Sequence, residues 1–312
     1  MTGSQKFLSY LAPLSIGLLL IYVLFDQSGR AKVEAKQSVL QPVPASESAQ
    51  PFLAVSYDLP KQISFAGEPV PLQIPDVMER LDRELQVNIY LQSSTLFLLK
   101  RANRWLPRIT EILKANNIPE DFKYLPLIES GLLNDVSPKN AVGYWQIREP
   151  AGKELGLEIT KEVDERYDPI RSTEAACKYL RTSYSKFKNW TLVAASYNRG
   201  VAGVRSDLED QKVDNYYDAL LNVETSRYVF RILAIKEIFE NPAKYGFKIH
   251  ADHLYQPEPL REIDITESIH NLVAFSKERG ANYKILKRHN PWLRQNKLSV
   301  KKGKTYQIAL PQ

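Results

Sequence analysis

One carboxylate is a candidate for acid–base chemistry: Glu129, which follows an apolar run in the stretch from Tyr124 to Gly131. Gly131 can adopt the left-handed conformation that ends a helix, so the sequence predicts Glu129 in that helix's last turn. The negative end of the helix dipole and an apolar setting both disfavour an ionised carboxylate, and both raise its pKa. Such a glutamate can act as a general acid near neutral pH. The alternative is a solvated glutamate at a helix end.

Four residues shortly after Glu129 supply groups that bind sugars. They are a hydroxyl, a glycine that permits close approach, a flat apolar ring and an amide, at Ser137, Gly143, Trp145 and Gln146. Glu-Ser-Gly, followed by Ser-x-x-x-Ala-x-Gly-x-Trp-Gln, resembles the soluble and membrane-bound lytic transglycosylases. That resemblance implies a catalytic domain with a goose-type lysozyme-like fold.

The resemblance continues as far as residue 229, because further segments match that family in order and spacing. Each segment alone is a weak signal, and together they are a strong one. They are Asp164–Pro169, Ser172–Ala176, Ala195–Gly200 and Glu224–Val229.

Residue by residue, the resemblance implies that Glu129 is the catalytic acid and base. It also implies six substrate-binding residues: Ser137 at the N-acetyl region, Gln146, Tyr197 and Asn198 along the sugar subsites, and Glu224 with Tyr228 supporting the floor of the cleft.

Ordinary glycosidases use two carboxylates, about 5 to 5.5 Å apart when retaining and about 6.5 to 9.5 Å apart when inverting. The motifs here offer one good candidate, Glu129, since a structural hydrogen-bonding role for Glu224 is as reasonable as a chemical one. The resemblance implies that Glu129 protonates the glycosidic oxygen leaving muramic acid and then takes a proton from that sugar's C6 hydroxyl, leaving a 1,6-anhydro end. The residues do not distinguish that hydroxyl from water. A murein or chitin hydrolase and a non-catalytic peptidoglycan-binding scaffold are the alternatives.

Two arginines depart from the family pattern. Arg148 follows Ile147 where the family often has Phe-Met, and Arg199 stands where a small residue is usual. We expect one of them to meet a carboxylate on the peptide stem of the glycan.

The composition is that of an ordinary globular protein, with 44% hydrophobic and 25% charged residues and a net charge of +6. The basic excess lies mostly after residue 250, and we interpret it as a solvated face in preference to a surface for nucleic acid, anionic lipid or an acidic glycopolymer. We expect peptidoglycan glycan strands and a membrane as partners, and no nucleic acid. The single cysteine, Cys177, excludes an internal disulfide, and the four histidines lack metal-site spacing. No metal or other cofactor is expected.

Residues 7–25 carry no charge. At about 1.5 Å per residue they span about 28 Å, close to a bilayer's hydrocarbon core. We therefore interpret residues 1–27 as a membrane anchor, in preference to a cleaved signal, and Lys6 places the N-terminus in the cytoplasm. The catalytic domain is then expected outside the cytoplasm, in the periplasm. Residues 28–75 are rich in proline and predict a tether, with at most a few residues packed on the domain.

Residues 76–250 show helical spacing of apolar residues and no strand-like alternation, which predicts a mainly α fold. Trp105 belongs to a broad apolar stripe and is interpreted as core. Pro126 lies three residues before Glu129, inside the predicted helix, and is expected to bend it.

Residues 258–312 predict a small α+β module with the order strand, helix, helix, strand, and with strands at Ile263–Thr266 and Tyr306–Pro311. This order, with the turn Asn290-Pro-Trp-Leu293, resembles a LysM glycan-binding module. The usual Gly-Asp-Thr after the first strand is replaced by Thr266-Glu-Ser268. The alternative is a packing appendage that closes the cleft.

Overall fold

The computed structural model describes residues 54–312 of the chain. The predicted membrane anchor and the first part of the predicted tether lie outside the described residues. Between residues 54 and 312, no helix is both long enough and apolar enough to cross a bilayer. This part of the chain is mainly helical, and its strands form three two-stranded sheets. The predicted fold class is confirmed.

The helical domain contains eight α-helices among the described residues. They are α2 (Pro75–Tyr90), α3 (Gln92–Ala115), α4 (Leu125–Ser130), α5 (Glu149–Glu154), α6 (Pro169–Phe187), α7 (Trp190–Arg199), α8 (Val201–Gln211) and α9 (Val223–Glu240), with 3-10 turns at Glu120–Tyr124, Glu165–Tyr167, Pro242–Tyr245 and Ala251–His253.

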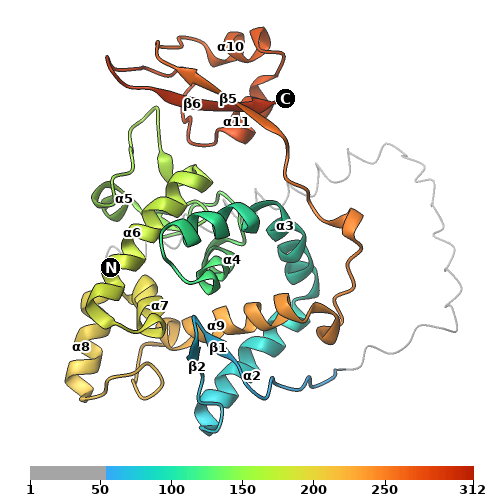
Figure 1. Ribbon diagram of the computed structural model, residues 1–312, viewed down its shortest axis with the longest axis vertical. Coiled ribbons are helices and arrows are strands. Elements are labelled where there is room, and N and C mark those ends of the chain that lie inside the picture. Colours follow the sequence, from blue (N-terminus) through green and yellow to red (C-terminus); the bar gives the residue numbers. More distant parts are fainter. Residues whose placement is uncertain (1–53) are drawn as a thin grey trace, which may run out of the picture. The chain divides into compact units, whose positions relative to one another are not determined.

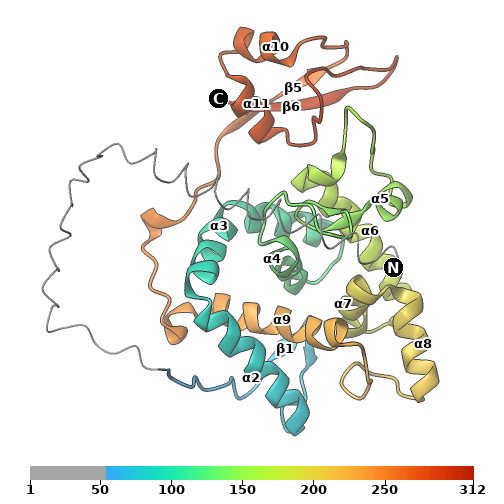
Figure 2. The same ribbon diagram turned by 180° about the vertical axis from the view of Figure 1, so that it is seen from behind.

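Helix α9 lies at the centre of this domain. Most of its side chains are buried, including Phe230, Ile232 and Leu233. It packs against α2, α7 and α4. Figures 1 and 2 show the short helix α4 between α3 and α6, beside α9. The helix that carries Glu129 is therefore enclosed by longer helices, which fix its position.

The predicted bend at Pro126 is wrong. The segment Glu120–Tyr124 is a 3-10 turn, and α4 begins after it at Leu125, so Pro126 stands in the first turn of the helix. A proline there loses no hydrogen bond, because the first N–H groups of a helix have no intrahelical partner. Pro126 starts the helix and does not bend it.

The C-terminal end of the predicted tether packs on the domain, as the sequence allowed for a few extended residues. Strands β1 (Ser64–Phe65) and β2 (Glu68–Pro69) form a hairpin packed on the helical domain. Phe65 is fully buried, and its ring meets that of Phe122 edge to face at 5.1 Å. The side chain of Asp121 accepts a hydrogen bond from the backbone N–H of Ala66 (2.7 Å). The high proline content suggested a tether, but this segment also contains a short alternation of apolar residues, and those residues are part of the core.

Phe65→Ala tests this hairpin. Truncating a buried phenylalanine removes its apolar contacts and leaves a cavity, so we expect the free energy of unfolding to fall by about 3 to 5 kcal/mol. Lys61→Ala, at an exposed position nearby, should change it by less than about 0.5 kcal/mol. Chemical denaturation of both variants makes the comparison, and equal stabilities would mean that the hairpin is not part of the core.

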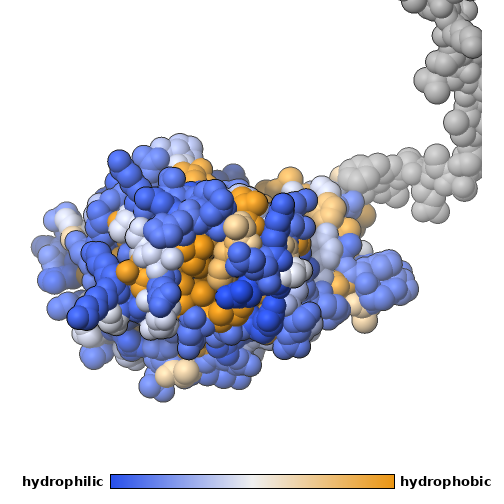
Figure 3. All heavy atoms as spheres, turned by 90° about the horizontal axis from the view of Figure 1, so that it is seen from above, coloured by the Kyte–Doolittle hydropathy of each residue, from blue (hydrophilic) through white to orange (hydrophobic). Residues whose placement is uncertain are grey.

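The C-terminal module has the predicted order, with β5 (Leu260–Ile265), α10 (Leu272–Glu278), α11 (Tyr283–His289) and β6 (Tyr306–Pro311). Strands β5 and β6 pair antiparallel, with Ile263 opposite Ile308. Asn290 is buried, and its side chain bonds the backbone of Ala309 in both directions, at 2.6 and 2.7 Å. Figure 3 shows the protein from above, and the surface seen in that view has apolar residues in its middle and hydrophilic residues around them.

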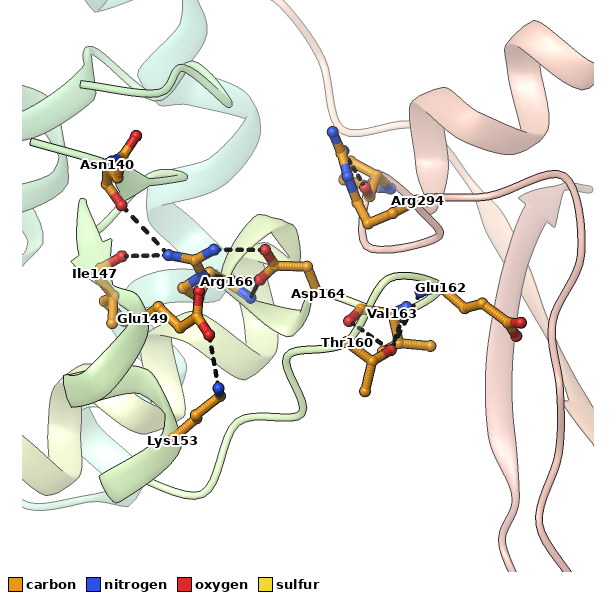
Figure 4. Close-up of polar contacts among 11 residues, drawn as sticks. Asn140, Ile147, Glu149, Lys153, Thr160, Glu162, Val163, Asp164, Arg166 and Arg294 are labelled. Carbon is orange, nitrogen blue, oxygen red and sulfur yellow. Dashed lines mark hydrogen bonds and ion pairs between the residues drawn. The ribbon is translucent and has the colours of Figure 1, made fainter. Parts of the chain in front are cut away.

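The loop before α6 joins the module to the helical domain (Figure 4). Val163 is part of the module's apolar core, and the backbone N–H of Asp164 donates to the carbonyl of Trp292 (2.9 Å). The Asp164 side chain also forms a buried ion pair with Arg166, at 2.7 Å. The guanidinium of Arg166 reaches the carbonyl oxygens of Asn140 and Ile147, each at 3.4 Å. Residues 163–166 thus contact both the module and residues 132–148, which we call the loop after Glu129.

Candidate active site

Glu129 lies in the last turn of α4, as predicted. Gly131 follows at the C-terminus of the helix with φ of 61°, and its N–H donates to the carbonyl of Leu127. Two arginines hold this helix end: Arg101 donates to the carbonyl of Gly131 (2.7 Å) and Arg231 to that of Ile128 (2.6 Å). The carboxyl group is therefore attached to a fixed backbone.

The surroundings of Glu129 favour its neutral form. Burial raises the pKa of the Glu129 carboxyl above its ordinary value. The hydroxyl of Tyr228 donates a hydrogen bond to Glu129 Oε1, and this bond and the charge of Arg231 oppose the shift without cancelling it. The charge of Glu224 adds to the rise. The group is suited to giving up a proton and then remaining stabilised as a carboxylate.

Two tyrosines flank this carboxyl, of which Tyr228 is buried and Tyr197 is partly buried. Burial and the charge of Glu129 raise the pKa of both Tyr197 and Tyr228, so both hydroxyls stay protonated and act as donors. Tyr228 donates to Glu129, whereas Tyr197 donates to the carbonyl of Trp145 (2.7 Å). Tyr228 was expected to support the floor of the cleft, and it is the direct hydrogen-bond partner of Glu129, the candidate acid.

The sugar-binding interpretation of Trp145 is wrong. Its side chain has no exposed surface, and its indole N–H donates to Thr173 Oγ1 (2.8 Å). Gly143 also serves the fold, because a Cβ on it would lie 2.1 Å from the carbonyl oxygen of Arg166. Both residues position the loop from inside.

Ser137 and Gln146 are on the same loop and bond its backbone. Ser137 Oγ accepts from the N–H of Ala141 (3.0 Å). Gln146 has φ of 48°, and its amide donates to the carbonyls of Gly143 (3.0 Å) and Asp135 (3.1 Å). The contacts of Ser137 and Gln146 with a substrate stay predictions. In such contacts, the Ser137 hydroxyl and the Gln146 side-chain oxygen would be the groups that bind the sugar.

Asn198 and Glu224 meet at the start of α9. The amide of Asn198 donates to Glu224 Oε1 (3.0 Å), and its oxygen accepts from Thr225 Oγ1 (2.7 Å). Glu224 is exposed and lies 3.8 Å from Lys139 Nζ. The pair therefore connects α7, α9 and the loop after Glu129.

The two unusual arginines differ in their surroundings. Arg199 pairs with Asp207 at 3.1 Å, whereas Arg148 is exposed at the end of β4 (Ile147–Arg148), which pairs with β3 (Ala141–Val142). The predicted contact with a peptide stem stays a prediction for both residues. To contact a peptide stem, Arg199 would first have to break its ion pair with Asp207.

Sequence reasoning missed Arg231, Arg101 and Arg166. Arg231 lies three residues after Tyr228, so helical spacing could have placed both on the face of α9 that meets Glu129. Arg101 and Arg166 carry no comparable local signal. Among residues 54–312, no three histidine, cysteine or acidic residues gather as a metal site would require.

Gly143→Ala should destabilise the protein strongly. The new methyl group would overlap the Arg166 carbonyl oxygen at a position with φ of 77°. Together, overpacking and the left-handed conformation should cost about 2 to 5 kcal/mol. Gly280 has the same φ and nothing within 4 Å of its virtual Cβ, so Gly280→Ala should cost only about 1 to 2 kcal/mol. Denaturation curves that show equal losses would contradict the close contact.

Glu129→Gln should stabilise the fold in a pH-dependent way. The folded protein holds the Glu129 proton more tightly than the unfolded chain, so its contribution to stability is complete below the unfolded pKa of about 4.3 and is lost as pH rises through the raised folded pKa. The amide avoids this loss. The melting temperature of the variant should match wild type at low pH and exceed it at neutral pH.

The matched control is Glu154→Gln, at an exposed position on α5, which should show no such trend. A Glu129→Gln variant that melts at or below the wild-type temperature at neutral pH would contradict the raised pKa.

Both structural parts of the chain match known families. Residues 108–219 match the transglycosylase SLT domain, and residues 261–312 match the soluble lytic transglycosylase C-terminal LysM-like domain. The chain therefore contains a transglycosylase SLT domain followed by a LysM-like domain, and both predicted resemblances are confirmed. The SLT match includes Glu129 but ends before Glu224 and Tyr228.

Two curated relatives are named as lytic transglycosylases. The chain is 30% identical over 195 residues to the membrane-bound lytic murein transglycosylase D of Escherichia coli strain K12 and, equally, to that of Escherichia coli O6:H1 strain CFT073. The alignments cover 60% of this chain and 42% of each relative, so the chain spans less than half the length of these proteins. A solved structure of an inactive mutant of the lytic transglycosylase Slt from Pseudomonas aeruginosa aligns with a TM-score of 0.35 and 17% identity, over 48% of this chain and 26% of that one.

Proposed function

We propose that this protein is a peptidoglycan lytic transglycosylase, which cleaves the bond between N-acetylmuramic acid and N-acetylglucosamine and leaves a 1,6-anhydromuramoyl end. The observation that carries the proposal is one partly buried carboxyl, Glu129, whose pKa is raised and which accepts a hydrogen bond from Tyr228 in a domain of the SLT family. The names of the relatives support the same activity.

The geometry around Glu129 suits both halves of this reaction. In the first half, the neutral carboxyl donates its proton to the glycosidic oxygen as the bond to the muramic acid breaks. In the second, the carboxylate takes the proton of the C6 hydroxyl, whose oxygen closes the ring. The Tyr228 hydroxyl stabilises the carboxylate between the two steps.

The remaining predicted residues would bind the sugar. Ser137 and Gln146 belong to the loop after Glu129, and Tyr197 and Asn198 belong to α7; their hydroxyl and amide groups are suited to sugar and N-acetyl groups. Glu224 is better suited to holding Asn198 than to chemistry, because it is exposed and bonded to that amide. With one carboxylate the site lacks the carboxylate pair that ordinary glycosidases use for hydrolysis, and the family match and the names of the relatives support ring closure by the C6 hydroxyl.

Glu129→Gln in the full-length chain should lower the rate of peptidoglycan cleavage by at least about a hundredfold, because the amide cannot donate or accept the proton. Mass spectrometry of the products from purified peptidoglycan should show anhydro ends for wild type and almost no products for the variant. Glu154→Gln, on the exposed side of α5, is the control and should cleave normally.

The other outcomes identify the rival functions. Reducing ends, heavier by one water, would identify a murein or chitin hydrolase. Absence of products from wild-type protein would identify a non-catalytic scaffold. Undiminished cleavage by Glu129→Gln would move the chemistry away from this carboxyl.

The proposed location is the cell envelope, with residues 7–25 as a membrane anchor and the catalytic domain outside the cytoplasm. The uncharged length of that segment supports the anchor. The proline-rich residues after it would give the domain reach toward the glycan, and the LysM-like module at residues 261–312 would bind a strand.

A further inference from the structure

The hairpin of β3 and β4, within the loop after Glu129, has a backbone that is unfavourable by itself. Asn140 directly precedes β3, and Gln146, a predicted substrate-binding residue, directly precedes β4. Their φ angles are 58° and 48°. A non-glycine residue in this left-handed region costs on the order of 1 to 3 kcal/mol and persists only where surrounding contacts enforce it. The hairpin therefore needs support from other segments.

Arg166 gives that support. Its Nη1 donates long, charge-assisted hydrogen bonds to the carbonyl of Asn140 and to that of Ile147, the residue after Gln146, each at 3.4 Å. Its backbone carbonyl lies so close to Gly143 that only a glycine fits there. The Arg166 side chain is buried, so water does not compete for these bonds. One arginine thus contacts the start, the turn and the end of the hairpin.

The hairpin in turn bonds the residues around Glu129. The carbonyl of Tyr144 accepts from Oγ of Ser130, the residue that follows Glu129 (2.9 Å). The carbonyl of Trp145 accepts from the Tyr197 hydroxyl (2.7 Å), which flanks the carboxyl. A shift of the hairpin would therefore move the groups on both sides of Glu129.

Arg166 is itself oriented by Asp164 (Figure 4). The guanidinium donates to both carboxylate oxygens of Asp164, at 2.7 and 2.9 Å. A two-point pair of this kind fixes the plane of the guanidinium as well as its position. The backbone N–H of Asp164 donates to the carbonyl of Trp292, so the aspartate that holds Arg166 is bonded to the LysM-like module.

Glu162 attaches the same segment to the module a second time. Its carboxylate accepts from the backbone N–H of Ser299 (2.8 Å) and pairs with Lys297 (3.0 Å). Its carbonyl accepts from the backbone N–H of Arg294 (2.7 Å). The guanidinium of Arg294 also lies 3.8 Å from the centre of the Tyr167 ring. The residues on both sides of Asp164 and Arg166 are thus held by the module.

We propose that Arg166 is a positioning residue for the proposed active site, and that the LysM-like module keeps Arg166 in place through Asp164 and Glu162. The proposal rests on the proposed function. It gives the module a part in turnover, through the hairpin beside Glu129, that is separate from any binding of glycan to the module.

Arg166→Lys tests this role, because lysine keeps the charge of Asp164 paired but lacks the fork that reaches two carboxylate oxygens and two carbonyls. For peptidoglycan cleavage by the full-length chain, kcat should fall at least about tenfold and KM should change by less than about threefold. Hydrogen exchange of the backbone amides of residues 140–148 should become faster.

Arg227→Lys is the matched control. Arg227 of α9 forms a similar two-point pair with buried Glu84 of α2, at 2.6 and 3.2 Å. The substitution should leave kcat and the exchange of residues 140–148 unchanged. Melting temperatures set an assay temperature at which every variant is folded. If Arg166→Lys does not fold, the double variant Asp164→Asn with Arg166→Gln, which removes both charges, takes its place.

Glu162→Ala tests the part of the module, because it removes the side-chain bonds to Ser299 and Lys297 and leaves Arg166 intact. It should lower kcat by about threefold, in the same direction as Arg166→Lys, and make the exchange of residues 140–148 faster. Unchanged kcat and exchange in this variant would overturn the role of the module.

The other outcomes also decide the proposal. Normal kcat and normal exchange in Arg166→Lys would limit the buried pair to a role in stability. An equal loss of kcat in Arg227→Lys would mean that any loosening of the domain slows cleavage, and would contradict a specific role for Arg166. Wild-type protein that cleaves no peptidoglycan would refute the proposed function, and the exchange rates alone would then decide whether Arg166 holds the hairpin.

Discussion

The hydrogen bond from Tyr228 to Glu129 is the interaction on which the rest of the site depends. It joins the short helix α4 to the central helix α9, and Arg231 adds a second bond between the same two helices. Burial of the carboxyl works against folding at neutral pH, since the fold favours the protonated group. The tyrosine limits that cost by stabilising the charge when it forms. Stability and proton transfer are therefore set by the same few contacts.

The loop after Glu129 owes its shape to contacts on its inner side. Trp145 is anchored in the core, Gly143 lies against the Arg166 carbonyl, and Gln146 bonds the loop's own backbone. A rigid support of this kind keeps side chains oriented before a ligand arrives, which lowers the entropy that binding must cost.

The same loop borders both the proposed catalytic site and a cavity of about 880 Å³ whose walls also include His289 and Trp292 of the LysM-like module. Asn134 and Tyr144 line the cavity, while Ser137 and Gln146 are predicted to face the sugar beside Glu129. The loop before α6 supports this arrangement, because Val163 enters the module's core and Arg166 reaches the loop carbonyls. The LysM-like module is thus packed against the helical domain through a segment that also contacts the loop of the candidate active site.

The sequence by itself determined the local features: Glu129 in the last turn of a helix ended by Gly131, the mainly helical domain, and the strand and helix order of the module. These follow from the spacing of apolar residues and from one left-handed glycine, which act over a few residues. Only the tertiary structure decided that Trp145 is buried, that residues 63–70 belong to the core, and that Tyr228 rather than a second carboxylate is the partner of Glu129. Those outcomes depend on which distant segments pack together, and the identity of a residue's neighbours across the fold is not encoded in the spacing around it.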